Sequence, residues 1–289
     1  MRVLSLFDGI SCGQVALERV GIPVEVYYAS EIEPNAIKIT QKNYPNTVQL
    51  GDVTKINFEE FIGKVDMVIG GSPCQDLSIA KANREGLNGI KSRLFFKYIE
   101  ALQTIKPRYF LLENNYSMPK EAREQITKII GVEPVLINSA LVSAQNRKRL
   151  YWTNIPITSQ PEDRRVLLKD IIEYGFVDRD KALCLARRYA GFTGSQSYLC
   201  RRYFGKSFGQ AVFNGNIEEI KNKWLNDHYF ESKEVNIRPL TCVECERLQT
   251  LPDNYTAVIS SEIARKEAIG NGWTVDVIAH IFNGLKEVV

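Results

Sequence analysis

The stretch VLSLFDGISCGQVALERVG, residues 3–21, joins an apolar run to an amphipathic segment through a short loop that contains two glycines. The apolar residues 3–7 predict a buried strand, and residues 13–21 predict a helix that ends at Gly21. The connecting loop, FDGISCG, is not the G-x-G-x-x-G loop of dinucleotide-binding proteins. A strand, a glycine-containing loop and a helix in this order are typical of the first unit of an α/β sheet.

The alternation of apolar runs and amphipathic segments continues to about residue 155. Further apolar runs predict strands at residues 24–31, 48–52, 65–71, 108–114, 133–140 and 149–155. Segments 34–44 and 93–105 predict helices, the first with Pro34 in its first turn. Because parallel strands need crossover connections, this order predicts an α/β, Rossmann-like fold with a mostly parallel seven-stranded sheet and helices on both faces.

Polar or reactive side chains follow five of the predicted strands, at the point where each strand ends. They are Asp8, Glu31, Asp52, Glu113 and the Ser-Pro-Cys sequence at 72–74. Ligands of open α/β sheets bind outside the carboxyl ends of the strands. The sequence therefore predicts one site along this edge of the sheet.

The composition favours a cytoplasmic protein without a metal ion. The net charge of the 289 residues is +3, and no apolar run approaches the roughly 18 residues of a membrane helix. The apolar run at the start of the sequence is too short for a signal peptide. The cysteines are expected as free thiols, and the Cys242-x-x-Cys245 pair lacks the histidines or second pair of a zinc site. We expect a cytoplasmic or nucleoid-associated location.

Between about residues 156 and 236 the regular alternation stops, and the sequence becomes irregular, basic and aromatic. Residues 181–210 contain six Lys or Arg residues and no acidic residue, interleaved with Tyr and Phe. This composition suits a surface that follows a phosphate backbone, and a solvated loop region is the alternative. Order returns after residue 236, where 260–272 and 273–288 predict helices.

The acidic residues near the first loop indicate the kind of cofactor. A carboxylate at Asp8 repels a pyrophosphate, whereas Glu31 is well placed for ribose hydroxyls and Asp52 for an adenine amino group. These residues favour a cofactor with adenosine but no phosphates, and S-adenosylmethionine, with its ammonium and sulfonium groups, matches. Cys74 would then lie beside a methyl donor and Glu113, which suggests nucleophilic activation of an electron-poor ring.

Six ordered motifs resemble those of the DNA (cytosine-5) methyltransferases. They are FDGISCG (7–13), GGSPCQDLS (70–78), LLENN (111–115), AQNRKR (144–149), RPLTCVECERLQTLPDNY (238–255) and IGNGWTVDVIAHI (269–281). The last motif also resembles the eukaryotic de novo branch. Asn115, where the family usually has valine, and Leu251, where it has phenylalanine, are departures from the pattern. The motifs span residues 3 to about 285 and leave 156–236 uncovered, the place of the family's target-recognition domain.

The resemblance implies an S-adenosylmethionine-dependent methyltransferase fold and a catalytic role for each of four residues. Cys74 would attack carbon 6 of a cytosine that is flipped out of the duplex. Glu113 would hold the ring nitrogen N3 and the exocyclic amine. Arg149 would contact the O2 oxygen, and Arg147 the flanking phosphate or backbone.

The resemblance also implies binding residues, partners and domain limits. The cofactor residues would be Phe7, Asp8, Gly9, Ile10, Cys12, Gly13, Glu31, Ile32, Asp52, Val53, Pro73, Asn271, Trp273 and Thr274. The DNA-binding residues would be Gln75, Ser78, Arg187, Arg188, Arg201, Arg202 and Lys206. Residues 1–155 and 237–289 would form the catalytic domain, and 156–236 the target-recognition domain. The expected partner is double-stranded DNA, with no membrane and no metal, and the oligomeric state is left open with a monomer as the default.

Two alternatives use the same motifs. One is an enzyme that methylates cytosine in transfer RNA, and the basic region 156–236 favours DNA over it. The other is a catalytically silent DNA-binding paralogue, which the presence of Cys74, Glu113, Glu31 and Asp52 disfavours. The absence of G-x-G-x-x-G disfavours a dinucleotide-dependent oxidoreductase.

Overall fold

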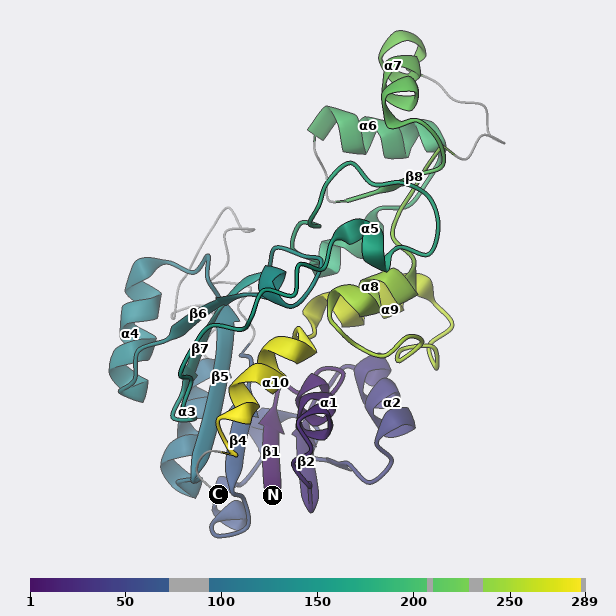
Figure 1. Cartoon of the computed structure of the whole chain (residues 1–289). Coiled ribbons are helices and arrows are strands. Elements are labelled where there is room, and N and C mark those ends of the chain that lie inside the picture. The colour runs from purple at the N-terminus through teal and green to yellow at the C-terminus, as the bar shows by residue number, and fades with distance from the viewer. Residues whose placement is uncertain (73–93, 207–209, 229–235, 287–289) are drawn as a thin grey trace. The chain divides into compact units, whose positions relative to one another are not determined.

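A computed structural model describes residues 1–72, 94–206, 210–228 and 236–286 of the chain (Figure 1). The chain divides into two compact units. We call Met1–Asn138, Lys148–Pro161 and Val275–Val289 the sheet unit, and Ser139–Arg147 with Glu162–Thr274 the second unit. Segments 139–147 and 237–274, which the sequence groups with the catalytic part, thus fold with the second unit. The assignment of 156–236 to target recognition stays a prediction.

The sheet unit contains the predicted seven-stranded sheet, with strand order β3-β2-β1-β4-β5-β7-β6. The strands are β1 (Arg2–Leu6), β2 (Val26–Ser30), β3 (Val48–Gln49), β4 (Met67–Gly70), β5 (Tyr109–Asn115), β6 (Val135–Asn138) and β7 (Lys148–Thr153). All neighbours from β3 to β5 are parallel, and β7 is antiparallel to both β5 and β6. The mostly parallel α/β fold is therefore confirmed.

Strand β3 is shorter than the predicted strand 48–52. The Leu50 N–H still donates to the Ala29 carbonyl, but Gly51 has a φ of 72°, which turns the chain out of the sheet. Glycine adopts this left-handed conformation without steric cost. Asp52 then begins the short 3-10 helix η1 (Val53–Lys55) instead of extending the strand.

The helices of the sheet unit are α1 (Cys12–Arg19), α2 (Pro34–Asn43), α3 (Leu94–Ile105), α4 (Lys120–Ile130) and α10 (Val275–Asn283), with the 3-10 helices η1 and η2 (Phe58–Phe61). One core contains side chains of α3, α4 and η2 packed on Leu4, Val68 and Leu112 of the central strands. Helix α1 packs along α10 (Figure 1). Helices on both sides bury the parallel strands, which is why those strands are apolar throughout.

Two helices of the sheet unit differ from the sequence-based expectation. Helix α4 was not predicted, because only Ala122 and Ile126 on it are buried and the apolar pattern is correspondingly weak. Pro119 before it and Gly131 after it, with a φ of 82°, are its sequence signals. Helix α10 ends earlier than the predicted 288, and a side chain at Gly284 would collide with the Pro156 carbonyl.

The second unit contains α5 (Leu168–Ile171), α6 (Gln196–Lys206), α7 (Ile217–Asp227), α8 (Cys242–Leu248) and α9 (Glu262–Asn271), the 3-10 helices η4 (Ser139–Leu141) and η5 (Arg187–Gly191), and the hairpin strands β8 (Val212–Phe213) and β9 (Ile237–Arg238). The expectation of an irregular 156–236 region is wrong for α6 and α7. Each helix has a narrow buried side, Leu199 and Tyr203 in α6 and Ile220 and Trp224 in α7. The (i, i+4) spacing of these pairs fits a helix, but their polar neighbours hide the pattern.

The motif R-x-L-T-x-x-E builds a buried ion pair in the second unit. The two terminal guanidinium nitrogens of Arg238 each lie 2.8 Å from a carboxylate oxygen of Glu244, whose side chain is fully buried. The same carboxylate accepts the backbone N–H groups of Thr241 and Glu173, each at 2.8 Å. Thr241 and Glu244 also form a capping box at the start of α8. This motif therefore ties β9, α8 and the segment after α5 together.

We expect Glu244→Gln to lower the free energy of unfolding by about 1.5–3 kcal/mol, because Arg238 loses its counter-charge while the side-chain shape is kept. Urea unfolding followed by circular dichroism measures this change. The control is Glu124→Gln, which removes an ion pair between two exposed side chains, Glu124 and Lys120, and should change stability by about 0.5 kcal/mol or less. Equal effects of the two substitutions would contradict the assignment.

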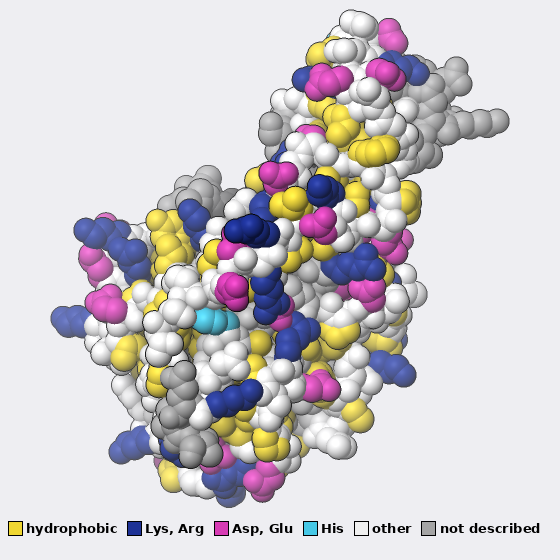
Figure 2. All heavy atoms as spheres, viewed as in Figure 1, with side chains coloured by type: hydrophobic (Ala, Val, Ile, Leu, Met, Phe, Trp, Pro, Cys, Tyr) yellow, Lys and Arg dark blue, Asp and Glu magenta, His cyan; other side chains and the backbone are white. Residues whose placement is uncertain are grey.

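None of the helices in the described ranges has the length and apolarity needed to cross a bilayer. On the face drawn in Figure 2, basic and acidic side chains are interspersed, in keeping with the small net charge of +3.

Candidate active site

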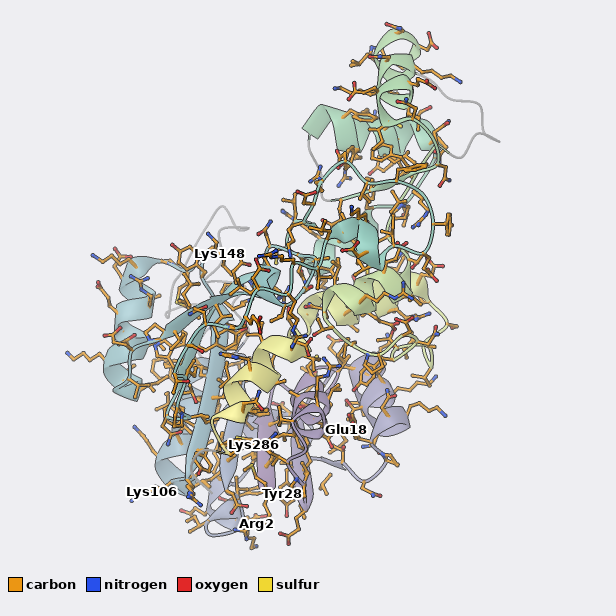
Figure 3. The ribbon with its side chains drawn as sticks, in the orientation of Figure 1. Arg2, Glu18, Tyr28, Lys106, Lys148 and Lys286 are labelled. Carbon is orange, nitrogen blue, oxygen red and sulfur yellow. The ribbon has the colours of Figure 1, made fainter. Side chains whose placement is uncertain are left out.

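The polar residues predicted at the strand ends lie at one end of the parallel sheet. Lys148, which begins β7 beside the end of β5, marks this end, and Arg2 and Lys106 mark the opposite end (Figure 3). Asp8, Glu31 and Asp52 follow strands there, and Glu113 lies in the last part of β5. The segment 73–93, with the predicted residues Pro73, Cys74, Gln75 and Ser78, lies outside the described residues.

The loop between β1 and α1 has an unusual backbone. Phe7, Gly9 and Ser11 have φ values of 60°, 61° and 57°, all in the left-handed region. For Phe7 and Ser11, which carry a Cβ atom, this conformation costs energy, and such residues cluster at ligand sites. The loop therefore turns sharply away from the sheet directly after Leu6.

Glu31 holds this loop through its carboxylate. Oε2 accepts the Gly9 N–H at 2.8 Å, and Oε1 accepts the N–H groups of Ile32 and Glu33 at 2.7 and 2.8 Å. A carboxylate oxygen accepts about two hydrogen bonds. Oε2 therefore keeps capacity for a hydroxyl donor, such as those of a ribose.

Asp52 follows β3, the next strand in the sheet, and caps η1. Its Oδ1 accepts the backbone N–H and the hydroxyl of Thr54, at 2.9 and 2.8 Å. These two hydrogen bonds hold the pKa of Asp52 below its usual value. The ionised side chain is therefore an acceptor in a fixed orientation. Ile32, next to Glu31, is 67% exposed to solvent, so it is accessible to a flat apolar ligand.

The predicted cofactor residues of the sheet unit differ in what they can offer a ligand. The side chains of Ile10, Cys12 and Val53 are buried, so only their backbone groups can reach a ligand. Gly13 lies in the buried first turn of α1. Burial raises the pKa of Asp8 to about 6, against hydrogen bonds from neighbouring hydroxyls that lower it. Carboxylates, an exposed isoleucine and a half-buried Phe7 fit a group that combines adenosine with a cation.

The Glu31 arrangement gives a direct prediction for cofactor affinity. Glu31→Gln removes the charge and one acceptor, so we expect S-adenosylmethionine to bind roughly 10- to 100-fold more weakly. Isothermal titration calorimetry measures the dissociation constant. Glu33→Gln is the matched control, because Glu33 is exposed and its side chain does not cap α2. Equal affinities of the two variants would count against Glu31 as a ligand.

Glu113 and Arg149 form an ion pair at the carboxyl end of β5. The distance from Arg149 Nε to Glu113 Oε1 is 2.8 Å, and both side chains are largely buried. Asn115 pairs with Arg149 and Glu113 with Tyr151 in the antiparallel β5–β7 ladder, so Glu113 and Arg149 lie on the same face. A carboxylate and a guanidinium held together in this way offer an acceptor and donors to one polar ring.

Arg147 belongs to the same motif as Arg149 but lies in the second unit. Its exposed fraction is 4%, and its guanidinium donates to the carbonyls of Leu185 at 2.7 Å and Gly272 at 2.8 Å. It also contacts Cys184 Sγ at 3.4 Å. These contacts favour a positioning role for Arg147 over the predicted contact with DNA.

A buried network in the second unit includes residues that the sequence did not single out. Gln145 donates to the Leu248 carbonyl at 2.6 Å and to Gln249 at 3.0 Å. Gln249 accepts the Thr274 hydroxyl at 2.8 Å, and Thr274 accepts that of Ser139 at 2.9 Å. Gln145, Gln249 and Thr274 each lie in one of the resembling motifs, and this was the signal available in the sequence, whereas Ser139 lies in none of them. The buried Thr274 thus has a structural partner, and its predicted cofactor contact stays a prediction.

The other predicted residues of the second unit are more accessible. Asn271 is exposed and Trp273 is half-buried. Arg187 and Arg188 are exposed on η5, and Arg187 lies 3.4 Å from Glu267. Their binding roles stay predictions.

Two further predicted DNA-binding residues, Arg201 and Arg202, lie over the ring of Tyr198 on α6. The distances from the guanidinium carbons to the ring centroid are 5.4 and 5.6 Å, and Arg202 donates to the Tyr198 hydroxyl at 2.7 Å. The side chain of Lys206 lies outside the described residues. Cations stacked on an aromatic ring suit contact with a nucleic acid, but this role also stays a prediction.

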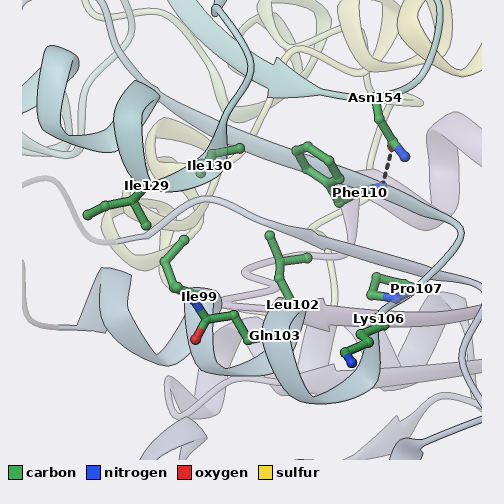
Figure 4. Close-up of a pocket in the computed structure, with 9 residues that line it drawn as sticks. All are labelled: Ile99, Leu102, Gln103, Lys106, Pro107, Phe110, Ile129, Ile130 and Asn154. Carbon is green, nitrogen blue, oxygen red and sulfur yellow. Dashed lines mark hydrogen bonds between the residues drawn. The ribbon is translucent and has the colours of Figure 1, made fainter.

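A cavity of about 300 Å³ lies away from these residues, between α3, α4 and the start of β5 (Figure 4). Leu102, Phe110 and Ile130 line it, and Lys106 stands at its edge. The Phe110 N–H donates to Asn154 at 2.9 Å. Since this cavity is at the amino end of β5, it is not part of the candidate site.

Comparisons with known proteins agree with the motifs. The sequence model of the family described as C-5 cytosine-specific DNA methylase matches residues 1–160 and 185–287. Orphan methyltransferase M.SPRI of Bacillus phage SPR is 34% identical over 266 residues, which cover 83% of this chain and 59% of that protein. Orphan methyltransferase M.Rho11sI of Bacillus phage rho11s is also 34% identical, over 48% of its length. The chain thus spans about half to three-fifths of these phage relatives.

A relative of similar length and a solved structure extend the likeness over the whole chain. Type II methyltransferase M.NgoPII of Neisseria gonorrhoeae is 26% identical, over 100% of this chain and 96% of that protein. The crystal structure of S. pombe Dnmt2 methyltransferase has a TM-score of 0.72 at 17% identity, covering 100% and 99% of the two chains, and shows the shared fold. The predicted family resemblance is confirmed: this chain belongs to the C-5 cytosine-specific DNA methylase family.

Proposed function

We propose that the chain is a DNA (cytosine-5-)-methyltransferase that uses S-adenosylmethionine and modifies a flipped-out cytosine in duplex DNA. The observation that carries this proposal is the Glu113–Arg149 pair, at the same end of the sheet as the loop held by Glu31. The family membership and the names of the relatives, which are methyltransferases, support it.

The residues at the strand ends would hold the cofactor. Glu31 would accept ribose hydroxyls, Asp52 the adenine amino group, and Phe7 and Ile32 would pack on the adenine. Asp8 would face the cationic part of the molecule. When bound, S-adenosylmethionine supplies an electrophilic methyl group.

The chain's own side chains would carry out the steps at the cytosine ring. The Cys74 thiolate would form a bond from Sγ to carbon 6 of cytosine, which moves electron density towards carbon 5. Glu113 would hold N3 in its protonated form and accept from the exocyclic amine, while Arg149 donates to O2. Arg149 also keeps Glu113 in one orientation, as their 2.8 Å contact requires. After methylation, solvent water would accept the carbon 5 proton, the electron pair of that C–H bond would form the carbon 5–carbon 6 double bond, and the Sγ–carbon 6 bond would break to release the Cys74 thiolate.

The proposal includes double-stranded DNA as the partner and the cytoplasm, at the nucleoid, as the location. The exposed arginines of η5 and the Arg–Tyr198 stack on α6 are the basic groups that support a nucleic-acid substrate.

The test is transfer of labelled methyl groups from S-adenosylmethionine to duplex DNA of mixed sequence and, separately, to bulk transfer RNA. We expect label in DNA, recovered as 5-methylcytosine after digestion to nucleosides. Label only in transfer RNA would replace the DNA substrate by RNA. Cofactor binding without transfer to either nucleic acid would support a silent DNA-binding paralogue instead.

A further inference from the structure

A buried row of polar side chains lies beneath the loop that follows β1. Among the hydroxyl groups that hydrogen-bond to Asp8, Ser11 donates to Oδ2 and Tyr27 donates to Oδ1, the latter at 2.9 Å. Tyr27 is on β2, and 2% of it is exposed. Both carboxylate oxygens of Asp8 are therefore held from below by groups that water does not reach.

Ser11 is itself held by residues further from the loop. Gln14 Nε2 lies 3.2 Å from the Ser11 hydroxyl oxygen and 2.7 Å from that of Thr47. Ser11, Gln14 and Thr47 are all buried. The row thus connects the loop, α1, β2 and the segment after α2. Ser11 has a left-handed φ and its side chain does not cap α1; its hydroxyl donates to Asp8 instead.

Packing alone does not account for the hydroxyl group of Tyr27. Burying a hydroxyl is unfavourable unless it is hydrogen-bonded, and phenylalanine would fill the same apolar space. Burial and the nearby Asp8 raise the pKa of Tyr27 well above its usual value, so the phenol remains a donor. The hydroxyl therefore serves Asp8.

The charge of Asp8 depends on this arrangement. Burial raises its pKa to about 6, and the negative charge of Glu31 acts in the same direction. Hydrogen bonds from Ser11, Ser5 and Tyr27 oppose this increase. Without the hydroxyl of Tyr27, a larger fraction of Asp8 would be protonated near neutral pH.

We propose that Tyr27 is a positioning residue for cofactor binding, which holds the Asp8 carboxylate in the orientation and the ionised form that a cationic cofactor requires. This inference rests on the proposed function, because it takes S-adenosylmethionine as the ligand of the loop. Ser11 shares the task, and Gln14 and Thr47 keep Ser11 in place.

The affinity for S-adenosylmethionine should depend on pH in one direction only. The ionised form of Asp8 attracts an ammonium or sulfonium group, so binding is strongest above about pH 6 and weakens as the pH falls through that value. Tyr27→Phe removes a hydrogen bond that favours the ionised form. The midpoint of the pH profile should therefore move to higher pH in this variant.

The experiment measures the dissociation constant of S-adenosylmethionine by calorimetry from pH 5 to pH 8, for the wild type, Tyr27→Phe and Tyr28→Phe. Tyr28 is the matched control: it is the next residue of β2, and its ring makes an edge contact with Phe61, away from Asp8 (labelled in Figure 3). We expect about tenfold weaker binding at pH 7.5 for Tyr27→Phe, with an upward shift of the midpoint. Tyr28→Phe should match the wild type.

A second variant separates positioning from simple loss of folding. Thr47→Val removes the acceptor of Gln14, at a distance from Asp8, and should weaken cofactor binding by about twofold to threefold with a smaller shift of the midpoint. Wild-type binding and an unchanged pH profile in Tyr27→Phe would overturn the inference. A wild-type chain that does not bind S-adenosylmethionine would instead overturn the proposed function and this inference together.

Discussion

Replacing Cys74 by alanine is expected to abolish methyl transfer while leaving cofactor binding intact. Loss of the nucleophile in an enzyme that forms a covalent intermediate lowers the rate by roughly 10⁴- to 10⁶-fold. In the sequence, Cys74 comes shortly after β4, which ends at Gly70 and whose carboxyl end is at the candidate site. Methyl transfer to duplex DNA from labelled S-adenosylmethionine measures the rate, and calorimetry with the same cofactor confirms that its site is retained.

A trapping experiment makes the role of Cys74 specific. When fluorine replaces the hydrogen on carbon 5, the final loss of a proton cannot occur, so the Sγ–carbon 6 bond should persist. We expect a protein–DNA adduct that survives denaturation for the wild type and none for Cys74→Ala. Cys184→Ala, which removes an exposed thiol, should form the adduct as the wild type does. An adduct in Cys74→Ala would assign the nucleophile to another residue.

The strand-end acids could be predicted from the sequence because their placement depends on one simple pattern. Each parallel strand is an apolar run, and Glu31 and Glu113 come at the ends of such runs. Once the fold is α/β, these residues must meet at one edge of the sheet. Their contacts could be predicted less directly, since one of the three backbone donors to Glu31, the Gly9 N–H, depends on the left-handed turn at Gly9.

The different surroundings of Arg147 and Arg149 could not be predicted from the sequence. They are two residues apart in one motif, yet Arg149 pairs with Glu113 in the sheet unit and Arg147 donates to carbonyls in the second unit. The difference depends on where β7 begins, at Lys148, and on its antiparallel register with β5. Neither is visible in the spacing of the motif.

Tyr27 and helix α6 show why the remaining features were missed. Tyr27 resembles any apolar strand residue, and its partner Asp8 is brought to it by the parallel pairing of β1 and β2. Helix α6 buries only a narrow side, so its basic and aromatic residues dominate the sequence pattern. Long-range pairing and narrow buried surfaces are tertiary effects that local periodicity does not contain.

Glu113→Gln is expected to slow methyl transfer by about 10²- to 10⁴-fold, the range for removing an acid–base group that acts on the reacting ring. Glutamine keeps the shape of the side chain and can still accept a hydrogen bond from Arg149, so the β5–β7 pairing should persist. It cannot hold N3 in the protonated form as a carboxylate does. The rate under single-turnover conditions measures the effect, with cofactor affinity expected to remain at the wild-type value.

A double-mutant cycle with Arg149→Gln tests whether the two side chains act as one unit. If Arg149 works partly by orienting Glu113, the double variant should be about as slow as the slower single variant, rather than slower by the product of both effects. The matched control is Lys148→Gln, which removes the neighbouring exposed charge at the start of β7 and should alter the rate little. A Glu113→Gln rate within about threefold of the wild type would remove Glu113 from the chemical step, because an ion pair that only stabilises the fold would leave the rate unchanged.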